Sequence, residues 1–261
     1  MLSNLHYQEH GLTGPDAPVL VLIHGLFGSA DNLSVIRRHF EGSHRVLNFD
    51  LPDHGLSPWS AHFSFANYAS QIVNTLRDAN VANASFVAHS LGGKVAMYLA
   101  HLHPEIVEHI VCLDIAPVAY EPRHHNVLAG LTGVNLAGVK SRKDAQQQLA
   151  KHVVDLGTQA FLLKSLYQSS EGDWAWRFNL DLLVKEYSVL SQWDLDDQLV
   201  YADSILFIKG SKSDYITRDH QATINQQFPK ASAKIVDAGH WLHAEKPNIV
   251  NTLITKHLLG S

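Results

Sequence analysis

The sequence predicts an α/β fold in which a mostly parallel β-sheet is covered by helices on both faces. Two observations lead to this prediction. Short and almost wholly apolar runs recur along the chain, as expected for strands that are buried on both faces. Stretches with helical periodicity separate these runs. The chain has 261 residues, of which 46% are hydrophobic, and this is enough to bury one large core.

The apolar runs give six predicted strands. They cover Val19–His24, Arg45–Asp50, Ala84–His89, Ile110–Asp114, Ser204–Ile208 and Ala233–Val236. The clearest helix between them spans Asn67–Asn80, where Tyr68, Ile72 and Leu76 recur on one face. Parallel strands joined by right-handed crossovers bring their carboxyl ends to one edge of the sheet, and ligands bind there.

The alternation of strands and helices stops between Pro117 and about Leu199, where the sequence is helical or irregular. An insertion of this size in an open sheet usually forms a cap over the strand ends. We therefore expect a core domain of residues 1–116 and 200–261 and a helical cap of residues 117–199.

Composition narrows the class of protein. The net charge of -5 argues against a nucleic-acid partner. The single cysteine, Cys112, excludes an internal disulfide and fits a reducing compartment. The first residues lack the pattern of a signal peptide, and no apolar run is long enough to span a bilayer. We expect a soluble cytoplasmic protein of undetermined oligomeric state.

Ser90 lies between the predicted strand 84–89 and a helical pattern that begins at Leu91. A serine in a sharp strand-to-helix turn is typical of a nucleophile elbow, whose usual pattern is Gly-x-Ser-x-Gly. Here Ala88 occupies the first glycine position, and alanine is the mildest replacement. These five residues alone fit an ordinary strand–helix loop equally well, so the prediction depends on the rest of the chain.

A serine hydroxyl is a weak nucleophile and needs a base beside it. His240 follows Gly239 in the loop after the last predicted strand, in the chain order serine, acid, histidine. The chain has 18 histidines, so a lone one carries little weight. The nearest rival, His243, is expected to begin the next helix and to point elsewhere.

Two aspartates fit the third position of a triad. Asp114 ends the strand that follows the elbow helix, and Asp214 lies in the loop after the next sheet strand. Both loops open on the same edge of the sheet. The alternative interpretation is that Asp114 caps a turn and that Asp214 is an exposed loop residue. The spacing of the sequence does not show which of the two aspartates is the acid.

Acyl transfer also requires hydrogen-bond donors for the oxyanion. The N–H of Leu91, directly after the nucleophile, is one predicted donor. The second is the N–H of Leu26, in the glycine-flanked loop 24–29 after the first long strand. The alternative for that loop is a plain glycine turn. The segment 50–57 is interpreted as a structural brace for these turns.

With these residues in place, the chain resembles the α/β-hydrolase-fold serine esterases, and in particular the bacterial YbfF esterases. The segments that carry the resemblance extend nearly from end to end and are His24–Ser29, Asp31–Leu33, His54–Ser57, His89–Lys94, Asp114–Pro117, Trp176–Asn179 and Ala238–Pro247. The resemblance implies hydrolysis of small-molecule esters with short acyl chains, and acyl-CoA thioesters as a further candidate class, without a cofactor. It also favours Asp114 over Asp214 as the acid.

Other enzyme classes and a binding module fit parts of the same pattern. Haloalkane dehalogenases and epoxide hydrolases resemble this chain in fold but place an aspartate at the elbow. A C–C bond hydrolase or a cofactor-free haloperoxidase uses the same serine and histidine, so only substrates distinguish them from an esterase. A degenerate binding module would lack a triad member, and none is missing. No metal site is expected, because the pairs His101/His103 and His124/His125 lack a third ligand at suitable spacing.

Aromatic side chains are the candidates for an apolar substrate pocket. They are Phe27, Trp176, Phe178 and Trp241. The alternative is that they pack in the core.

Overall fold

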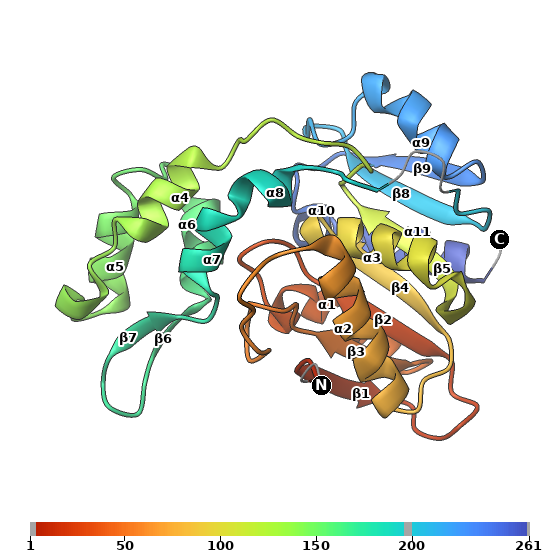
Figure 1. Cartoon of the computed structure of the whole chain (residues 1–261), viewed down its shortest axis with the longest axis horizontal. Coiled ribbons are helices and arrows are strands. Elements are labelled where there is room, and N and C mark those ends of the chain that lie inside the picture. Colours follow the sequence, from red (N-terminus) through yellow and green to blue (C-terminus); the bar gives the residue numbers. More distant parts are fainter. Residues whose placement is uncertain (1–3, 196–199, 260–261) are drawn as a thin grey trace.

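The computed structural model describes residues 4–195 and 200–259, and its centre is a seven-stranded sheet (Figure 1). The strand order is β1-β3-β2-β4-β5-β8-β9. The strands are β1 (Tyr7–Gly11), β2 (Val19–Ile23), β3 (Arg45–Phe49), β4 (Ala84–His89), β5 (Val107–Leu113), β8 (Ile205–Gly210) and β9 (Ala231–Val236). All six predicted strands are present, so the predicted α/β fold is confirmed.

Strand β1 is an addition that the sequence did not predict. It pairs antiparallel with β3, from Tyr7 opposite Phe49 to Gly11 opposite Arg45, whereas the other neighbouring strands of this sheet pair parallel. Its residues are half-buried or exposed. An edge strand of this kind lacks the apolar run by which a strand buried on both faces is recognised.

Helices cover both faces of the sheet (Figure 1). Their bounds are α1 (Ser34–Phe40), α2 (Phe65–Asp78), α3 (Leu91–Leu102), α4 (His125–Thr132), α5 (Arg142–Leu149), α6 (Leu156–Leu163), α7 (Leu180–Lys185), α8 (Tyr187–Ser191), α9 (Gln221–Gln227), α10 (Leu242–Glu245) and α11 (Pro247–Leu258). Helix α2 matches the predicted helix 67–80 within two residues at each end, and the Ser64 side chain caps it by accepting the Asn67 N–H.

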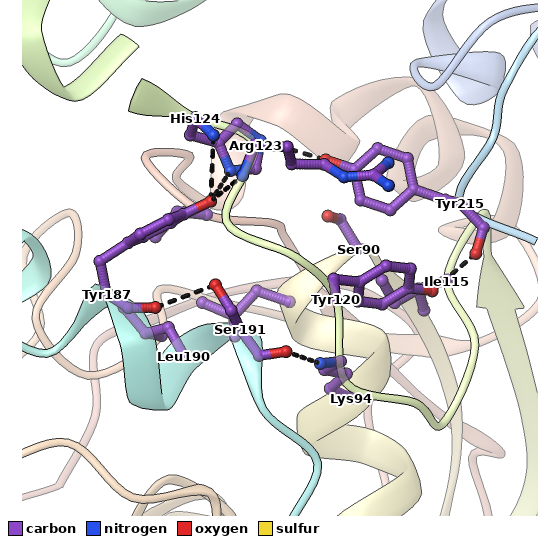
Figure 2. Close-up of a pocket in the computed structure, with 12 residues that line it drawn as sticks. Ser90, Lys94, Ile115, Tyr120, Arg123, His124, Tyr187, Leu190, Ser191 and Tyr215 are labelled. Atoms are coloured by element: carbon purple, nitrogen blue, oxygen red, sulfur yellow. Dashed lines mark hydrogen bonds between the residues drawn. The ribbon is translucent and has the colours of Figure 1, made fainter. Parts of the chain in front are cut away.

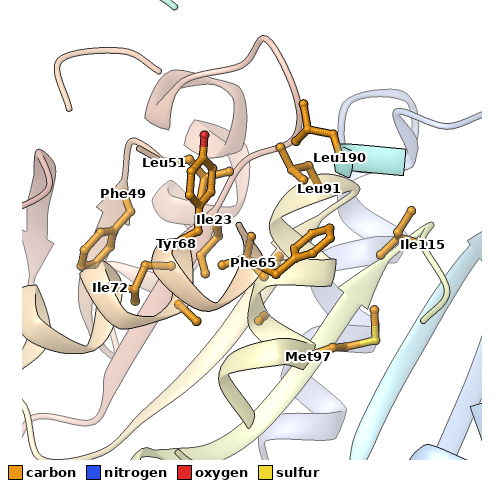
Figure 3. Packing of buried hydrophobic residues seen from close by; sticks show 14 of the residues in the cluster. Ile23, Phe49, Leu51, Phe65, Tyr68, Ile72, Leu91, Met97, Ile115 and Leu190 are labelled. Carbon is orange, nitrogen blue, oxygen red and sulfur yellow. The ribbon is translucent and has the colours of Figure 1, made fainter. Parts of the chain in front are cut away.

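Alternate residues of each strand point to opposite faces, and so the protein has two hydrophobic clusters. Leu20 and Leu22 of β2 belong to the cluster formed with α1 and α11. Val21 and Ile23 belong to the cluster formed with α2 and α3. Figure 3 shows the second cluster, in which Leu190 of α8 lies beside Leu91 at the start of α3. The segment between β5 and β8 therefore shares a core with the sheet domain.

The segment between β5 and β8 carries helices α4 to α8 and lies to one side of the sheet (Figure 1). We call it the cap segment. The expectation of wholly helical or irregular structure there is wrong in one place, because β6 (Leu166–Gln168) and β7 (Trp174–Trp176) form an antiparallel hairpin. Strands of three residues are too short to produce a recognisable alternation. Within the described ranges, no helix is long and apolar enough to cross a membrane.

Candidate active site

Ser90 is held in a strained turn between β4 and α3. Its backbone has φ 52° and ψ -120°, a conformation that is costly for a residue with a side chain. The Ser90 N–H donates to the carbonyl of Leu113, and its own carbonyl accepts the Gly93 N–H. A Cβ at Gly92 would lie 2.5 Å from the His24 carbonyl oxygen, so this position accepts only glycine. The turn has the geometry of a nucleophile elbow.

His240 lies between Ser90 and Asp114. Its Nε2 is 3.1 Å from Ser90 Oγ, and its Nδ1 is 2.7 Å from Asp114 Oδ2. Asp114 is fully buried at the end of β5, where its Oδ1 accepts the Gly210 N–H and its Oδ2 accepts the Ser213 hydroxyl. The carboxylate therefore holds the Nδ1–H tautomer, which leaves Nε2 free to accept a proton from serine.

Asp214 lies away from His240. Its side chain is 78% exposed, and its Oδ1 is 2.7 Å from the Arg123 guanidinium. Two neighbours of Asp214 contact Asp114 and His240 instead. Ser213 bonds to Asp114, and the ring of Tyr215 stacks on His240 with centroids 3.9 Å apart. The two aspartates that the sequence left as alternatives thus have different surroundings.

The two predicted oxyanion donors lie on the same side of Ser90. Leu26 and Leu91 line one cavity together with Ser90. Leu91 is the first residue of α3, and the first N–H groups of a helix have no partner within it. In the part of the chain that the structure describes, neither backbone N–H donates to a protein acceptor. Both donors are therefore available to a ligand atom beside Ser90.

The segment 50–57 braces these turns. Asp50 accepts the backbone N–H groups of Ala30 and Leu56, which fixes the loop after β2 to the loop after β3. His24 accepts the Leu51 N–H at Nε2 and donates from Nδ1 to the Gly25 carbonyl. Burial lowers the pKa of His24, so its ring is neutral and suited to this pair of bonds.

Two small cavities meet at Ser90. The first holds about 50 Å³ and extends towards Lys94, Tyr120 and Leu190 (Figure 2). The second holds about 60 Å³ and extends towards Phe161 and Trp241. His240 lines only the second cavity. Among the described residues, no Asp or Glu side chain lines either cavity.

The aromatic residues that were candidates for the pocket separate into two groups. Phe27 and Trp241 line the second cavity. Trp176 and Phe178 line neither cavity and are almost wholly buried. The Phe178 ring packs between Trp176, at 5.5 Å, and Phe27, at 5.1 Å. These two cap residues therefore belong to the packing between the cap segment and the loop after β2.

Lys94 and His124 line the first cavity, although no role in the site was predicted for either residue. Lys94 Nζ donates to the carbonyls of Ser191 and Gln192, and so connects α3 to the end of α8 (Figure 2). Burial lowers the pKa of Lys94 to about 7. Burial likewise lowers the pKa of His124 to about 4. The only earlier signal was that Lys94 belongs to one of the segments shared with the YbfF esterases.

His243 lies in the first turn of α10, which begins one residue earlier, and it stays close to the site. It is buried, and its ring lies 4.6 Å from that of His89. His89 Nε2 in turn donates to the carbonyl of His240. Within the described residues, no group of three or more His, Cys, Asp or Glu is arranged to hold a metal ion.

Comparison with known proteins finds hydrolases, among them esterases and a lipase. The profile described as "Alpha/beta hydrolase family" matches residues 20–252. Esterase YbfF of Escherichia coli K12 is 35% identical over 241 residues, which cover 92% of each chain, and this confirms the resemblance seen in the sequence. The sn-1-specific diacylglycerol lipase ABHD11 of Mus musculus is 32% identical over 250 residues, covering 92% of this chain and 81% of that protein. The solved structure "Marine microorganism esterase" has a TM-score of 0.93 at 29% identity and covers 97% of this chain and 99% of that one.

Proposed function

The chain belongs to the alpha/beta hydrolase family, and we propose that it is a serine hydrolase that cleaves carboxylic esters through an acyl-enzyme on Ser90. The observation that carries this proposal is the unbroken line of hydrogen-bonding atoms from Ser90 through His240 to Asp114, with two unpaired backbone N–H groups beside the serine. The names of the relatives support it, since they are an esterase and a lipase.

In the first step of the reaction, Ser90 Oγ attacks the ester carbonyl and His240 Nε2 takes its proton. The oxyanion accepts hydrogen bonds from the N–H groups of Leu26 and Leu91. His240 then gives the proton to the leaving alcohol. Asp114 keeps the imidazole in the reactive tautomer and stabilises its charged form. Water, activated by His240, releases the acid and restores the free serine, so neither step calls for a cofactor.

The two cavities receive different parts of the substrate. The leaving oxygen must lie within reach of His240 Nε2, and His240 lines only the second cavity. The alcohol therefore occupies the side of Phe161 and Trp241, and the acyl group occupies the side of Lys94 and Leu190. We expect this side to take short acyl chains, as the resemblance to the YbfF esterases implies. Acyl-CoA thioesters can follow the same two steps, with the thiol as leaving group.

The test is a panel of p-nitrophenyl esters and acyl-CoAs of graded acyl length, assayed with the wild type and with Ser90→Ala. We expect turnover to be highest on short esters and to fall about 10⁴-fold or more in Ser90→Ala. Circular dichroism melting curves of the two proteins provide the control for folding. A variant that keeps a tenth of wild-type turnover with an unchanged melting curve contradicts the acyl-enzyme on Ser90.

We also propose a cytoplasmic location, which is supported by the single cysteine. Cys112 is a free thiol, fully buried in β5, and burial raises its pKa. A buried thiol of this kind is unreactive and serves only in packing. A chain without a disulfide is typical of a reducing compartment. The substrate that we propose for the site is a small-molecule ester or thioester.

A further inference from the structure

The turn that presents the Leu26 N–H depends on its neighbour, Phe27. Phe27 has φ 61°, in the left-handed region that is unfavourable for a residue with a Cβ. Such a conformation persists only where surrounding contacts hold it. Phe27 directly follows Leu26 in a turn that the Gly28 N–H closes by donating to the Gly25 carbonyl, so contacts that fix Phe27 also restrain the turn from which the proposed oxyanion donor points.

The core domain holds Phe27 through its N–H. This group donates to His54 Nε2 at 3.1 Å. Nε2 must therefore be unprotonated, and the ring proton lies on Nδ1, which donates to the carbonyl of Pro52 at 2.9 Å. His54 is fully buried, and burial, followed by the neighbouring His24, lowers the pKa of His54 to about 3. The ring is thus a neutral acceptor throughout the physiological pH range.

The cap segment holds Phe27 through its carbonyl. Ser165 lies between α6 and β6, is almost wholly buried, and donates its hydroxyl to the Phe27 carbonyl at 3.0 Å. The Phe27 ring also packs on Phe178 of the cap segment. The two peptide groups that flank Phe27 are therefore fixed by different parts of the chain, one by the core and one by the cap segment.

We propose that Ser165 and His54 are positioning residues of the reaction, and that docking of the cap segment completes the oxyanion hole by fixing the Leu26–Phe27 turn. This inference rests on the proposed ester hydrolysis by Ser90. An oxyanion donor acts only when it points at the place where charge develops, and a displacement of about 1 Å can cost about 100-fold in rate. The hydroxyl of Ser165 thus affects the transition state without contacting the substrate.

The competing explanation is that Ser165 only stabilises the fold, as buried hydrogen bonds do. Gln159 provides a matched control. It is also a buried residue of the cap segment, its Nε2 donates to the Val153 carbonyl at 2.7 Å, and it lines neither cavity. Gln159→Met removes this hydrogen bond and the one that Gln159 Oε1 accepts from Gln146 Nε2 at 3.1 Å, but it leaves the contacts of Phe27 in place.

The experiment measures kcat and KM for p-nitrophenyl butyrate in the wild type, Ser165→Ala and Gln159→Met. We expect both variants to melt at a lower temperature. Only Ser165→Ala should lose kcat, by about tenfold and with KM unchanged. His54→Leu should lose about 100-fold, and His54→Gln, whose amide oxygen can accept the Phe27 N–H, should recover most of that loss.

A trifluoromethyl ketone gives a second measurement that a purely structural role would not affect. Ser90 Oγ adds to the carbonyl carbon of this ketone and forms a tetrahedral adduct. The oxyanion of the adduct occupies the same oxyanion hole as that of the reaction. Its inhibition constant should rise in Ser165→Ala by the factor by which kcat falls. Equal kcat in Ser165→Ala and Gln159→Met, with equal inhibition constants, would overturn the inference and leave the esterase proposal intact. A wild type that cleaves no ester would instead defeat the proposed function.

Discussion

Asp114 Oδ2 lies 2.7 Å from His240 Nδ1, although 126 positions separate the two residues in the chain. The contact arises because β5 ends at Leu113, and the next residue turns its side chain towards the loop after β9. Asp114 itself has φ 54°, and its N–H donates to the Ile208 carbonyl of β8. The Gly210 N–H and the Ser213 hydroxyl then fix the carboxylate. The acid is thus oriented by the neighbouring strand and by the loop that follows it.

Replacing each aspartate by asparagine should have very different effects. Asp114→Asn keeps the shape but permits the wrong tautomer of His240, and we expect kcat to fall about 10⁴-fold. Asp214→Asn removes only an exposed pair with Arg123, so its loss should stay under about tenfold. Steady-state kinetics of both variants on one short ester give the ranking. The reverse ranking would move the triad acid to Asp214, and similar partial losses would mean that the two carboxylates share the role.

The two cavities should be separable by mutation. Trp241→Ala enlarges the side assigned to the alcohol, and Leu190→Ala enlarges the side assigned to the acyl group. Over a matrix of esters, we expect Trp241→Ala to change the ranking of alcohols and Leu190→Ala to change the ranking of acyl chains, as seen in kcat/KM. If each variant changes the other ranking, the assignment of the two sides is reversed.

Phe178 should act on the rate without selecting the acyl chain. Its ring is buried against Phe27 and Trp176 and lines neither cavity. Phe178→Ala should cost about 3–5 kcal/mol of stability, and Phe178→Leu less. We expect Phe178→Leu to lower kcat by the same factor for every acyl length. A changed ranking of chain lengths would return Phe178 to the substrate pocket.

Buried histidines should make the fold sensitive to acid. Burial, followed by the neighbouring His240, lowers the pKa of His243 to about 3, and burial lowers that of His54 to about 3 and that of His124 to about 4. Below pH 6.5 the unfolded chain therefore binds protons that the native protein does not. The contribution of these groups to the free energy of unfolding is fully present above pH 6.5. It falls as the pH drops, by about 1.4 kcal/mol per pH unit for each group.

Urea unfolding at pH 7.5, 6.0 and 5.0 measures this loss. His243→Leu removes one of the titrating groups and should reduce the slope below pH 6.5 by about 1.4 kcal/mol per unit. His62, whose side chain is 78% exposed, is the control site, because His62→Leu leaves all the buried histidines in place. An unchanged slope in His243→Leu would mean that His243 is charged in the native protein.

Local sequence was sufficient to predict much of the fold and part of the site. Strands buried on both faces are mostly apolar, and for this reason β2, β4 and β8 could be recognised as nearly continuous apolar runs. The strand β1 and the hairpin of β6 and β7 were missed, because short or half-exposed strands carry no such run. The elbow at Ser90 was predicted from its adjacent residues together with His240 and the loop 24–29, because an ordinary strand–helix loop fits the adjacent residues equally well.

Residue spacing did not distinguish Asp114 from Asp214 and only the family resemblance favoured Asp114, whereas the tertiary structure gives the two carboxylates different neighbours, His240 for Asp114 and Arg123 for Asp214. It also separated Trp241 from Phe178, because an aromatic side chain is apolar whether it lines a cavity or fills a core. The sequence by itself determined which segments are buried and where the backbone must turn. Packing decided which side chains meet, because distances between residues far apart in the chain depend on every element that lies between them.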